Sequence, residues 1–412
     1  MLSLALTFGL FFAACTQNPT IQEAKLNLNN KNYSQALAAA NKAIEENSDA
    51  PEPYYYKGRI HYGMAEQEAD PAQRTDNYGA MREALNTALQ IYEKNDSQSA
   101  ESKDIIPLLR SAWSEEHDRG TRIIDTDSSL TQSLMHNAIA HLKNATVIIP
   151  DSTVSYQALG NAYYRDGQIS NAIGAFEQMV AQDSSKIQQV LEKLAFLYLE
   201  KGDANKATEY YQMADTTFQN DLNIMHGLAN AYISRDNHFR AIPLLRDLNE
   251  RAPQNVEYQL ALGTELFYLA RGKMDSVTTL YPRYKQEKDS SGIRDMQQKV
   301  GNIQELIQEA EAHMTEAVEL DDGNVQILNS AATFHQNSAN LFRKLADLDL
   351  PQQQTAELNS RIESHLKTAI PYLETLTETQ QEPQKYWGQL FQIHSYLGNT
   401  EKADEAMKKS DL

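Results

Sequence analysis

The chain has 412 residues, of which 41% are hydrophobic and 23% are charged, a composition typical of a folded globular protein. Lysine and arginine together number 37 against 56 aspartate and glutamate residues, so the formal net charge is −19. An acidic surface repels nucleic acid and anionic lipid headgroups, and we therefore expect neither as a partner.

The amino-terminal segment is typical of an export signal. Residues 2–14 are apolar or small, carry no charge and form a run too short for a membrane span, which needs about 20 residues. Two alanines directly precede Cys15, the sole cysteine of the chain, and this junction resembles the lipobox of bacterial lipoproteins. The resemblance implies cleavage of a signal peptide over 1–14, a lipidated tether over 15–20 and export to a bacterial membrane. Thr16 in place of aspartate favours the outer membrane, facing the periplasm; an ordinary signal peptide is the alternative.

A helical hairpin is predicted over residues 156–184, with its turn at Asp166-Gly167. Its apolar side chains recur at steps of three and four residues, which places them on one face of each helix. The apolar positions are Leu159, Ala162 and Tyr163 in the first helix and Ala172, Ile173, Phe176 and Met179 in the second. Because so short a hairpin cannot bury both of its faces, it needs similar neighbours on each side.

The spacing of this hairpin resembles the tetratricopeptide repeat, whose pattern is W-x2-L-G-x2-Y, then A-x3-F, then P, with a period of 34 residues. The matching residues here are Tyr156, Leu159, Gly160, Tyr163, Ala172 and Phe176. The pattern returns twice in register, at Tyr198 with Ala207 and at Tyr232 with Ala241. The resemblance implies an all-α superhelix of antiparallel helix pairs, with about nine units, in which small residues stand where helices approach closely.

The units are expected to differ in regularity along the chain. The expected divisions are 21–150 for N-terminal units with insertions, 153–255 for three regular units, 256–382 for extended units and 384–412 for a C-terminal unit. The insertions lie near 66–77, near 271–292 and near 340–356. The first should add about one helical turn and a polar surface loop at Asp70-Pro71, and the second should interrupt a repeat.

No catalytic or metal-binding motif is recognisable in the sequence, so we expect a non-enzymatic protein without cofactor or metal. His136 and His141 are five residues apart and do not share a helix face as paired ligands would. His61 and His394 stand where the repeat places tyrosine, which indicates helix packing rather than ligation. Phosphate loops, dinucleotide fingerprints and nucleophile elbows are not found.

The resemblance implies that the first helix of each pair lines a concave face that binds a protein segment. The polar residues expected on that face are Gln157, Asn161, Tyr164, Arg165, Gln189, Glu192, Asn223, His226 and Asn230. Two of them, Asn161 and Asn230, resemble the asparagines with which chaperone-binding members hold a peptide carboxylate. The matching lysines are missing, so a carboxylate clamp is not expected.

Two functions of different classes therefore compete. The first is a lipid-anchored scaffold of the cell envelope that binds a protein partner non-covalently. The second is an outer-membrane lipoprotein that binds glycans and resembles the starch-binding nutrient receptors, to which the aromatic run Tyr54–Tyr56 could contribute a platform.

Overall fold

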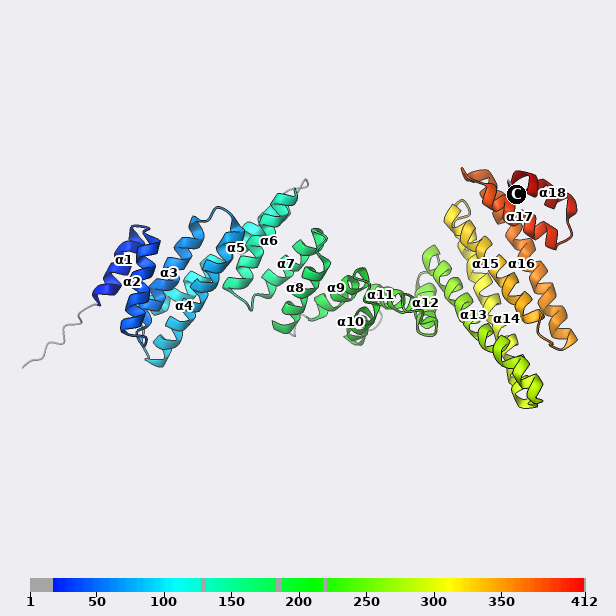
Figure 1. The fold of residues 1–412 in the computed structure, drawn as a ribbon, viewed down its shortest axis with the longest axis horizontal. Helices are drawn as coiled ribbons and strands as arrows, with labels where there is room; N and C mark the ends of the chain where they lie inside the picture. Colours follow the sequence, from blue (N-terminus) through cyan, green and yellow to red (C-terminus); the bar gives the residue numbers. More distant parts are fainter. Residues whose placement is uncertain (1–17, 127–130, 183–186, 218–220, 411–412) are drawn as a thin grey trace, which may run out of the picture. The chain divides into compact units, whose positions relative to one another are not determined.

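The computed structural model describes residues 18–126, 131–182, 187–217 and 221–410, and all of its regular structure is helical (Figure 1). These ranges contain eighteen α-helices and one short 3-10 helix, and no strand. Within the described residues, consecutive α-helices pack against each other in eight antiparallel pairs, as expected from the repeat pattern. The predicted fold class, an all-α tetratricopeptide-like solenoid of helix pairs, is confirmed. The predicted signal peptide and Cys15 lie outside the described residues. The predicted tether over 15–20 is wrong at its end, because Pro19 and Thr20 form the first turn of helix Pro19–Asn29 and Thr20 is buried.

The chain divides into two compact units, Met1–Val190 and Leu191–Leu412. The helices of unit 1 are α1 Pro19–Asn29, α2 Tyr33–Glu46, α3 Pro51–Gln67, η1 Pro71–Arg74, α4 Thr75–Lys94, α5 Ala100–Thr126, α6 Gln132–Ile148, α7 Thr153–Arg165 and α8 Ile169–Gln182. Helix α9, Ile187–Glu200, begins in unit 1 and ends in unit 2. The helices of unit 2 are α10 Ala204–Thr217, α11 Leu222–Ile233, α12 His238–Arg251, α13 Val256–Glu287, α14 Ser290–Leu320, α15 Val325–Ala346, α16 Gln352–Thr379, α17 Gln384–Tyr396 and α18 Thr400–Lys409. Within the described ranges, each helix is either too short or too polar to cross a membrane.

The regular pairs close as the repeat pattern predicts. Gly167 has a φ of +73° in the turn between α7 and α8, a left-handed conformation that favours glycine. A Cβ atom on Gly160 would lie 2.8 Å from the ring of Phe176, so the predicted close approach of the two helices is confirmed. Ala172 is fully buried beside it.

In the insertion at 66–77 the predicted helical turn is present, but the prediction that the loop at Asp70-Pro71 lies on the surface is wrong in part. The segment forms the 3-10 helix η1, and its Pro71 and Arg74 side chains are buried. The Arg74 Nε atom donates to the Glu68 carbonyl oxygen at 2.8 Å, and the guanidinium reaches Glu116 of α5. A charged residue in a polar stretch was expected to be exposed to solvent. Arg74 is buried instead, because it pairs with a buried carboxylate far along the chain.

That carboxylate is the centre of a buried polar network in unit 1, the Glu116 network. Glu116 is 0% exposed, and its Oε1 accepts from the Arg74 guanidinium and the Tyr78 hydroxyl, both at 3.0 Å. Its Oε2 lies 2.8 Å from His141 Nδ1 and accepts from Asn144 Nδ2 at 2.9 Å. Burial alone would raise the pKa of Glu116, but the hydrogen bonds from His141, Asn144 and Tyr78 outweigh it and hold the pKa below its ordinary value.

The predicted interruption at 271–292 is also wrong. Helix α13 continues to Glu287 and α14 begins at Ser290, so the segment lengthens a helix pair. Met274, Val277 and Tyr281 are buried at helical spacing, while the polar residues between them are exposed or half-buried. Figure 1 shows α13 and α14 as a long antiparallel pair of 32 and 31 residues beside α15 and α16.

A candidate partner-binding groove and a buried histidine cluster

Two adjoining hollows lie between α13 and α15, the first helices of two successive pairs in unit 2. They measure about 470 and 230 Å³ and share Phe267, Tyr268 and Asn337 in their walls. We call them together the α13/α15 groove. Its other lining residues are Thr264, Arg271 and Met274 of α13, Met314 of α14, and Asn329, Ser330, Thr333, Phe334, Asn340, Leu341, Arg343, Lys344 and Asp347 on or next to α15.

One wall of the groove is a polar stripe along α15. Its members are Asn329, Thr333, Asn337, Asn340 and Lys344, all exposed, at steps of four, four, three and four residues. This spacing places them on a single helix face. An asparagine amide both donates and accepts hydrogen bonds, so such a stripe can pair with the N–H and C=O groups of an extended peptide backbone.

The floor of the groove is aromatic. Phe267 and Phe334 are buried and meet edge to face, with ring centroids 5.9 Å apart. Tyr268 is 41% exposed, and its ring stacks on His238 at 5.5 Å. His238 in turn contacts the buried Glu265 carboxylate through Nδ1 at 2.6 Å, which fixes the stacking partner in place. The floor therefore offers a rigid apolar surface with one accessible ring.

The charge of the groove is opposite to that of the chain. Arg271, Arg343 and Lys344 line it with a single carboxylate, that of Asp347, although the whole protein has a net charge of −19. The guanidinium of Arg343 lies 4.9 Å from the centroid of the Tyr396 ring, a cation–π contact that orients it. The arrangement is suited to an anionic group on a bound segment.

The residues predicted for a concave face fall into two groups, one in each unit. In unit 1, α7 holds Gln157 and Asn161 half-buried and Tyr164 and Arg165 exposed. The Arg165 guanidinium donates to the Ile124 carbonyl oxygen at 3.3 Å.

In unit 2, Glu192 of α9 and Asn223 of α11 are exposed. The structure brings His226 and Asn230 together on α11, with His226 Nε2 2.9 Å from Asn230 Nδ2. The His226 ring also lies 5.7 Å from that of Tyr258 on α13. The side chain of Gln189 lies outside the described residues. That these nine residues bind a partner stays a prediction.

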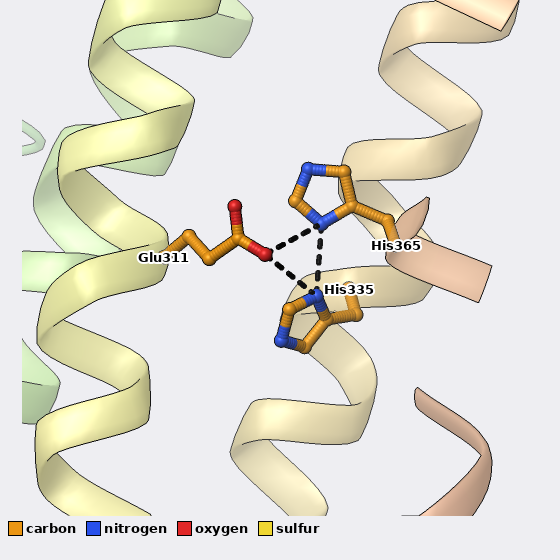
Figure 2. Close-up of side chains that lie close together, drawn as sticks. All are labelled: Glu311, His335 and His365. Carbon is orange, nitrogen blue, oxygen red and sulfur yellow. Dashed lines mark hydrogen bonds and ion pairs between the residues drawn. The ribbon is translucent and has the colours of Figure 1, made fainter. Parts of the chain in front are cut away.

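Sequence reasoning missed a second feature of unit 2, a buried histidine pair with a carboxylate, which we call the 311/335/365 cluster. Figure 2 shows Glu311 of α14 pointing toward His335 of α15 and His365 of α16. The two Nδ1 atoms are 2.8 Å apart, and Glu311 Oε1 lies 3.9 Å from each. The sequence separations of 24 and 30 residues match no ligand motif, so no local signal could have revealed the cluster.

His394 and His61 were predicted to pack between helices. His394 is buried in α17, so its predicted packing role is confirmed. His61 is half-buried, with Nδ1 3.1 Å from Asn77 Oδ1 on α4. The aromatic run proposed as a glycan platform is packed inward: Tyr55 is buried, and Tyr54 and Tyr56 pack against the same cluster of buried residues.

No protein-family model matches the sequence. No curated protein matches it either. Solved structures similar in fold include the MamA protein, 16% identical over 51% of this chain and 92% of that chain, with a TM-score of 0.37.

Two further similar structures are described as tetratricopeptide-repeat proteins. The C-terminal part of such a protein from Cytophaga hutchinsonii is 11% identical over 89% of this chain and 98% of that chain, with a TM-score of 0.34. YrrB, described as having an unusual peptide-binding site, is 14% identical over 53% of this chain and 97% of that chain, with a TM-score of 0.34. The peptide-binding site is a property of YrrB itself.

Proposed function

We propose that this protein is a non-catalytic scaffold of the bacterial cell envelope that binds an extended segment of a protein partner in the α13/α15 groove. The observation that carries the proposal is the coincidence, in one groove of an acidic chain, of an asparagine stripe, an aromatic floor and three cationic side chains. Each of the three features recognises a different part of a peptide.

The partner segment is defined by the chemistry of the groove. Asn329, Asn337 and Asn340 pair with its backbone, because amide side chains can satisfy both donors and acceptors. An apolar or aromatic side chain rests on Tyr268 and the phenylalanine floor. A carboxylate, from an acidic side chain or a chain terminus, meets Arg271, Arg343 or Lys344.

Attachment to the membrane through Cys15 is the second part of the proposal. The uncharged run before Cys15 and the small residues at the junction support export and lipidation, and Thr16 supports an outer-membrane location facing the periplasm. Replacing Cys15 by Ala should release the protein into the soluble fraction and abolish incorporation of labelled fatty acid. Membrane retention of that variant without any label would contradict the anchoring.

The groove is tested by site-specific photo-crosslinking in cells. A photoreactive residue at Asn337 should capture one dominant partner, whereas the same residue at Glu363, on the exposed face of α16, should not. Placing it at Asn161 and at Asn230 tests the predicted contacts of α7 and α11 in the same way. Capture from those positions but not from Asn337 would move the binding surface away from the α13/α15 groove.

A charge-reversal pair makes the test quantitative. Arg343→Glu with Lys344→Glu should weaken binding of the captured segment at least about tenfold, because hydrogen bonds to charged groups contribute roughly 1.5–3 kcal/mol each. The matched control is Lys299→Glu with Lys367→Glu, which changes the net charge equally on α14 and α16, away from the groove lining. Equal loss of binding in both double variants would indicate a general charge effect. A glycan array with clear hits and no crosslinked protein would favour the glycan-binding alternative.

A further inference from the structure

We propose that Glu311, His335 and His365 bind one divalent transition-metal ion of the zinc class, which joins helices α14, α15 and α16. The three side chains come from three different helices of unit 2 and converge on one point (Figure 2). The proposal does not depend on what the α13/α15 groove binds.

The distances between the three atoms fit a metal ion. A triangle with sides of 2.8, 3.9 and 3.9 Å has a circumscribed circle with a radius of about 2.1 Å. A point in the middle of Glu311 Oε1 and the two Nδ1 atoms is therefore about 2.1 Å from each, which matches the 2.0–2.2 Å that zinc takes with histidine nitrogen and carboxylate oxygen. At that point the ion lies in the plane of the three donors, so a tetrahedral site requires the two Nδ1 atoms, now 2.8 Å apart, to separate by about half an ångström.

Hydrogen bonding within the cluster does not account for it. The contact between the two Nδ1 atoms uses one proton and one lone pair, and the Glu311 oxygen, at 3.9 Å, is too far from either nitrogen for a hydrogen bond. His335 is 0% exposed, and its Nε2 atom has no hydrogen-bond partner among the described residues. The buried histidine pair thus faces a carboxylate while one imidazole nitrogen stays unsatisfied among the described residues. This arrangement is costly in itself, and a bound cation would stabilise it.

The protonation states favour ligation. Burial, together with the nearby His365, lowers the pKa of His335 to about 3, and burial with the charge of Arg361 lowers the pKa of His365 to about 4. Burial favours the neutral imidazole, which is the form in which histidine binds metals. Burial raises the pKa of Glu311 against the opposing charge of Arg361, so its carboxylate gains from a cation beside it.

Neighbouring rings hold the two imidazoles in position before any ion arrives. The His365 ring lies 5.5 Å from Phe342 and 5.9 Å from Phe334, and the His335 ring lies 6.0 Å from Tyr372. Restricting the rings in this way lowers the entropy lost on binding. The Glu311 side chain is 28% exposed, which provides a path for the ion and for a water molecule as fourth ligand.

The donor set indicates the class of metal. Two imidazole nitrogens and one carboxylate oxygen suit zinc, cobalt and iron in their divalent states, whereas calcium and magnesium prefer oxygen ligands throughout. Phe334 belongs both to the floor of the α13/α15 groove and to the rings around His365, so the ion would stiffen the wall behind the groove.

The test is metal titration of the full chain, without an affinity tag and after removal of metals by a chelator. We expect the wild-type protein to bind one equivalent of Zn²⁺ by calorimetry and to give the visible absorption of tetrahedral Co²⁺. Glu311→Gln and His365→Phe should each weaken binding by at least about 100-fold, because loss of even an outer-shell partner costs 10–100-fold. His136→Gln, which removes a histidine that is 54% exposed, should leave binding unchanged.

Two results would overturn the proposal. One is a wild-type chain that binds neither ion at micromolar concentration. The other is a His365→Phe or Glu311→Gln variant that binds like the wild type, which would place the ion elsewhere. Circular dichroism establishes whether each variant is folded. If His365→Phe does not fold, Glu311→Gln alone provides the test, because Glu311 is partly exposed and its replacement keeps the same shape.

Discussion

The Glu116 network of unit 1 and the 311/335/365 cluster of unit 2 both place a glutamate beside buried histidine, yet they are built differently. Glu116 receives two hydrogen-bond partners on each oxygen, including the guanidinium of Arg74. Glu311 approaches two imidazoles at 3.9 Å, and His335 keeps a nitrogen without a partner among the described residues.

The comparison separates a structural site from a ligand site. In the Glu116 network the positive charge comes from the protein, and the same side chains fix the insertion: Asn144 donates to the Pro71 carbonyl oxygen at 2.9 Å and accepts from Thr75 at 2.7 Å. In the 311/335/365 cluster the lone pairs converge, and the cation has to come from outside. The Glu116 network, whose polar atoms are paired within the protein, stabilises the fold by itself. The 311/335/365 cluster does so only when it binds its ligand.

The largest effect is expected from Glu116→Gln. Among the described residues, Glu66, at 3.6 Å, is then the one remaining ion-pair partner of the buried Arg74 guanidinium. Breaking a buried ion pair by removing one partner costs about 3–5 kcal/mol, and we expect that loss of unfolding free energy in unit 1. The measurement is urea unfolding followed by the fluorescence of Trp113, in a chain whose second tryptophan, Trp387, is replaced by Phe.

Glu311→Gln is the matched control for that variant. In metal-free protein it should change the unfolding free energy by less than about 1 kcal/mol, because it breaks no hydrogen bond between Glu311 and the imidazoles. Unfolding of this variant is followed by the fluorescence of Trp387, in a chain that also carries Trp113→Phe. Similar losses for the two substitutions would mean that the two glutamates have the same structural role.

Acidification should produce the second-largest effect, again in unit 1. The pKa of Glu116 is lower in the folded protein than its ordinary value of 4.5, so below that value the unfolded chain binds more protons. The stabilisation is therefore complete above about pH 4.5 and is lost as the pH falls through the folded pKa, by about 1.4 kcal/mol per pH unit within that window. Unfolding of the Trp113 reporter between pH 6 and pH 3 measures it. Because Glu116→Gln has no carboxyl group to titrate at this position, its profile should be flatter, and an unchanged slope would assign the effect to other carboxylates.

The regular units could be predicted from sequence because their signal is local. Leu159, Gly160 and Phe176 are within one hairpin, and their spacing alone states which faces pack. The continuation of α13 also had a local signal, in the spacing of Met274, Val277 and Tyr281. The polar residues around Pro282 obscured it, although proline is tolerated inside this helix.

The polar clusters could not be predicted because their partners lie on different helices. Arg74 and Glu116 are 42 residues apart, and either one alone is indistinguishable from a solvated charge of an acidic helical protein. The polar stripe of α15 consists of residues at helical spacing, but nothing in that spacing marks it as a groove wall, because its role depends on α13 lying beside it. Contacts between repeats follow from the superhelix and not from the repeat motif.

A double variant that removes both imidazoles separates the two sites most clearly, although its expected effect on stability is small. His335→Leu with His365→Phe replaces both members of the buried pair by apolar side chains, so that neither is left without its partner. Replacing both partners of a buried polar pair can be nearly neutral, and we expect a change within about 1.5 kcal/mol in metal-free protein. Added Zn²⁺ should raise the melting temperature of the wild type but not that of the variant, because an ion that binds only the folded state stabilises it. Thermal unfolding of the Trp387 reporter with and without Zn²⁺ measures both. A loss above about 3 kcal/mol without metal would instead give the histidine pair the same structural role as the Glu116 network, since the fold would then depend on the pair itself.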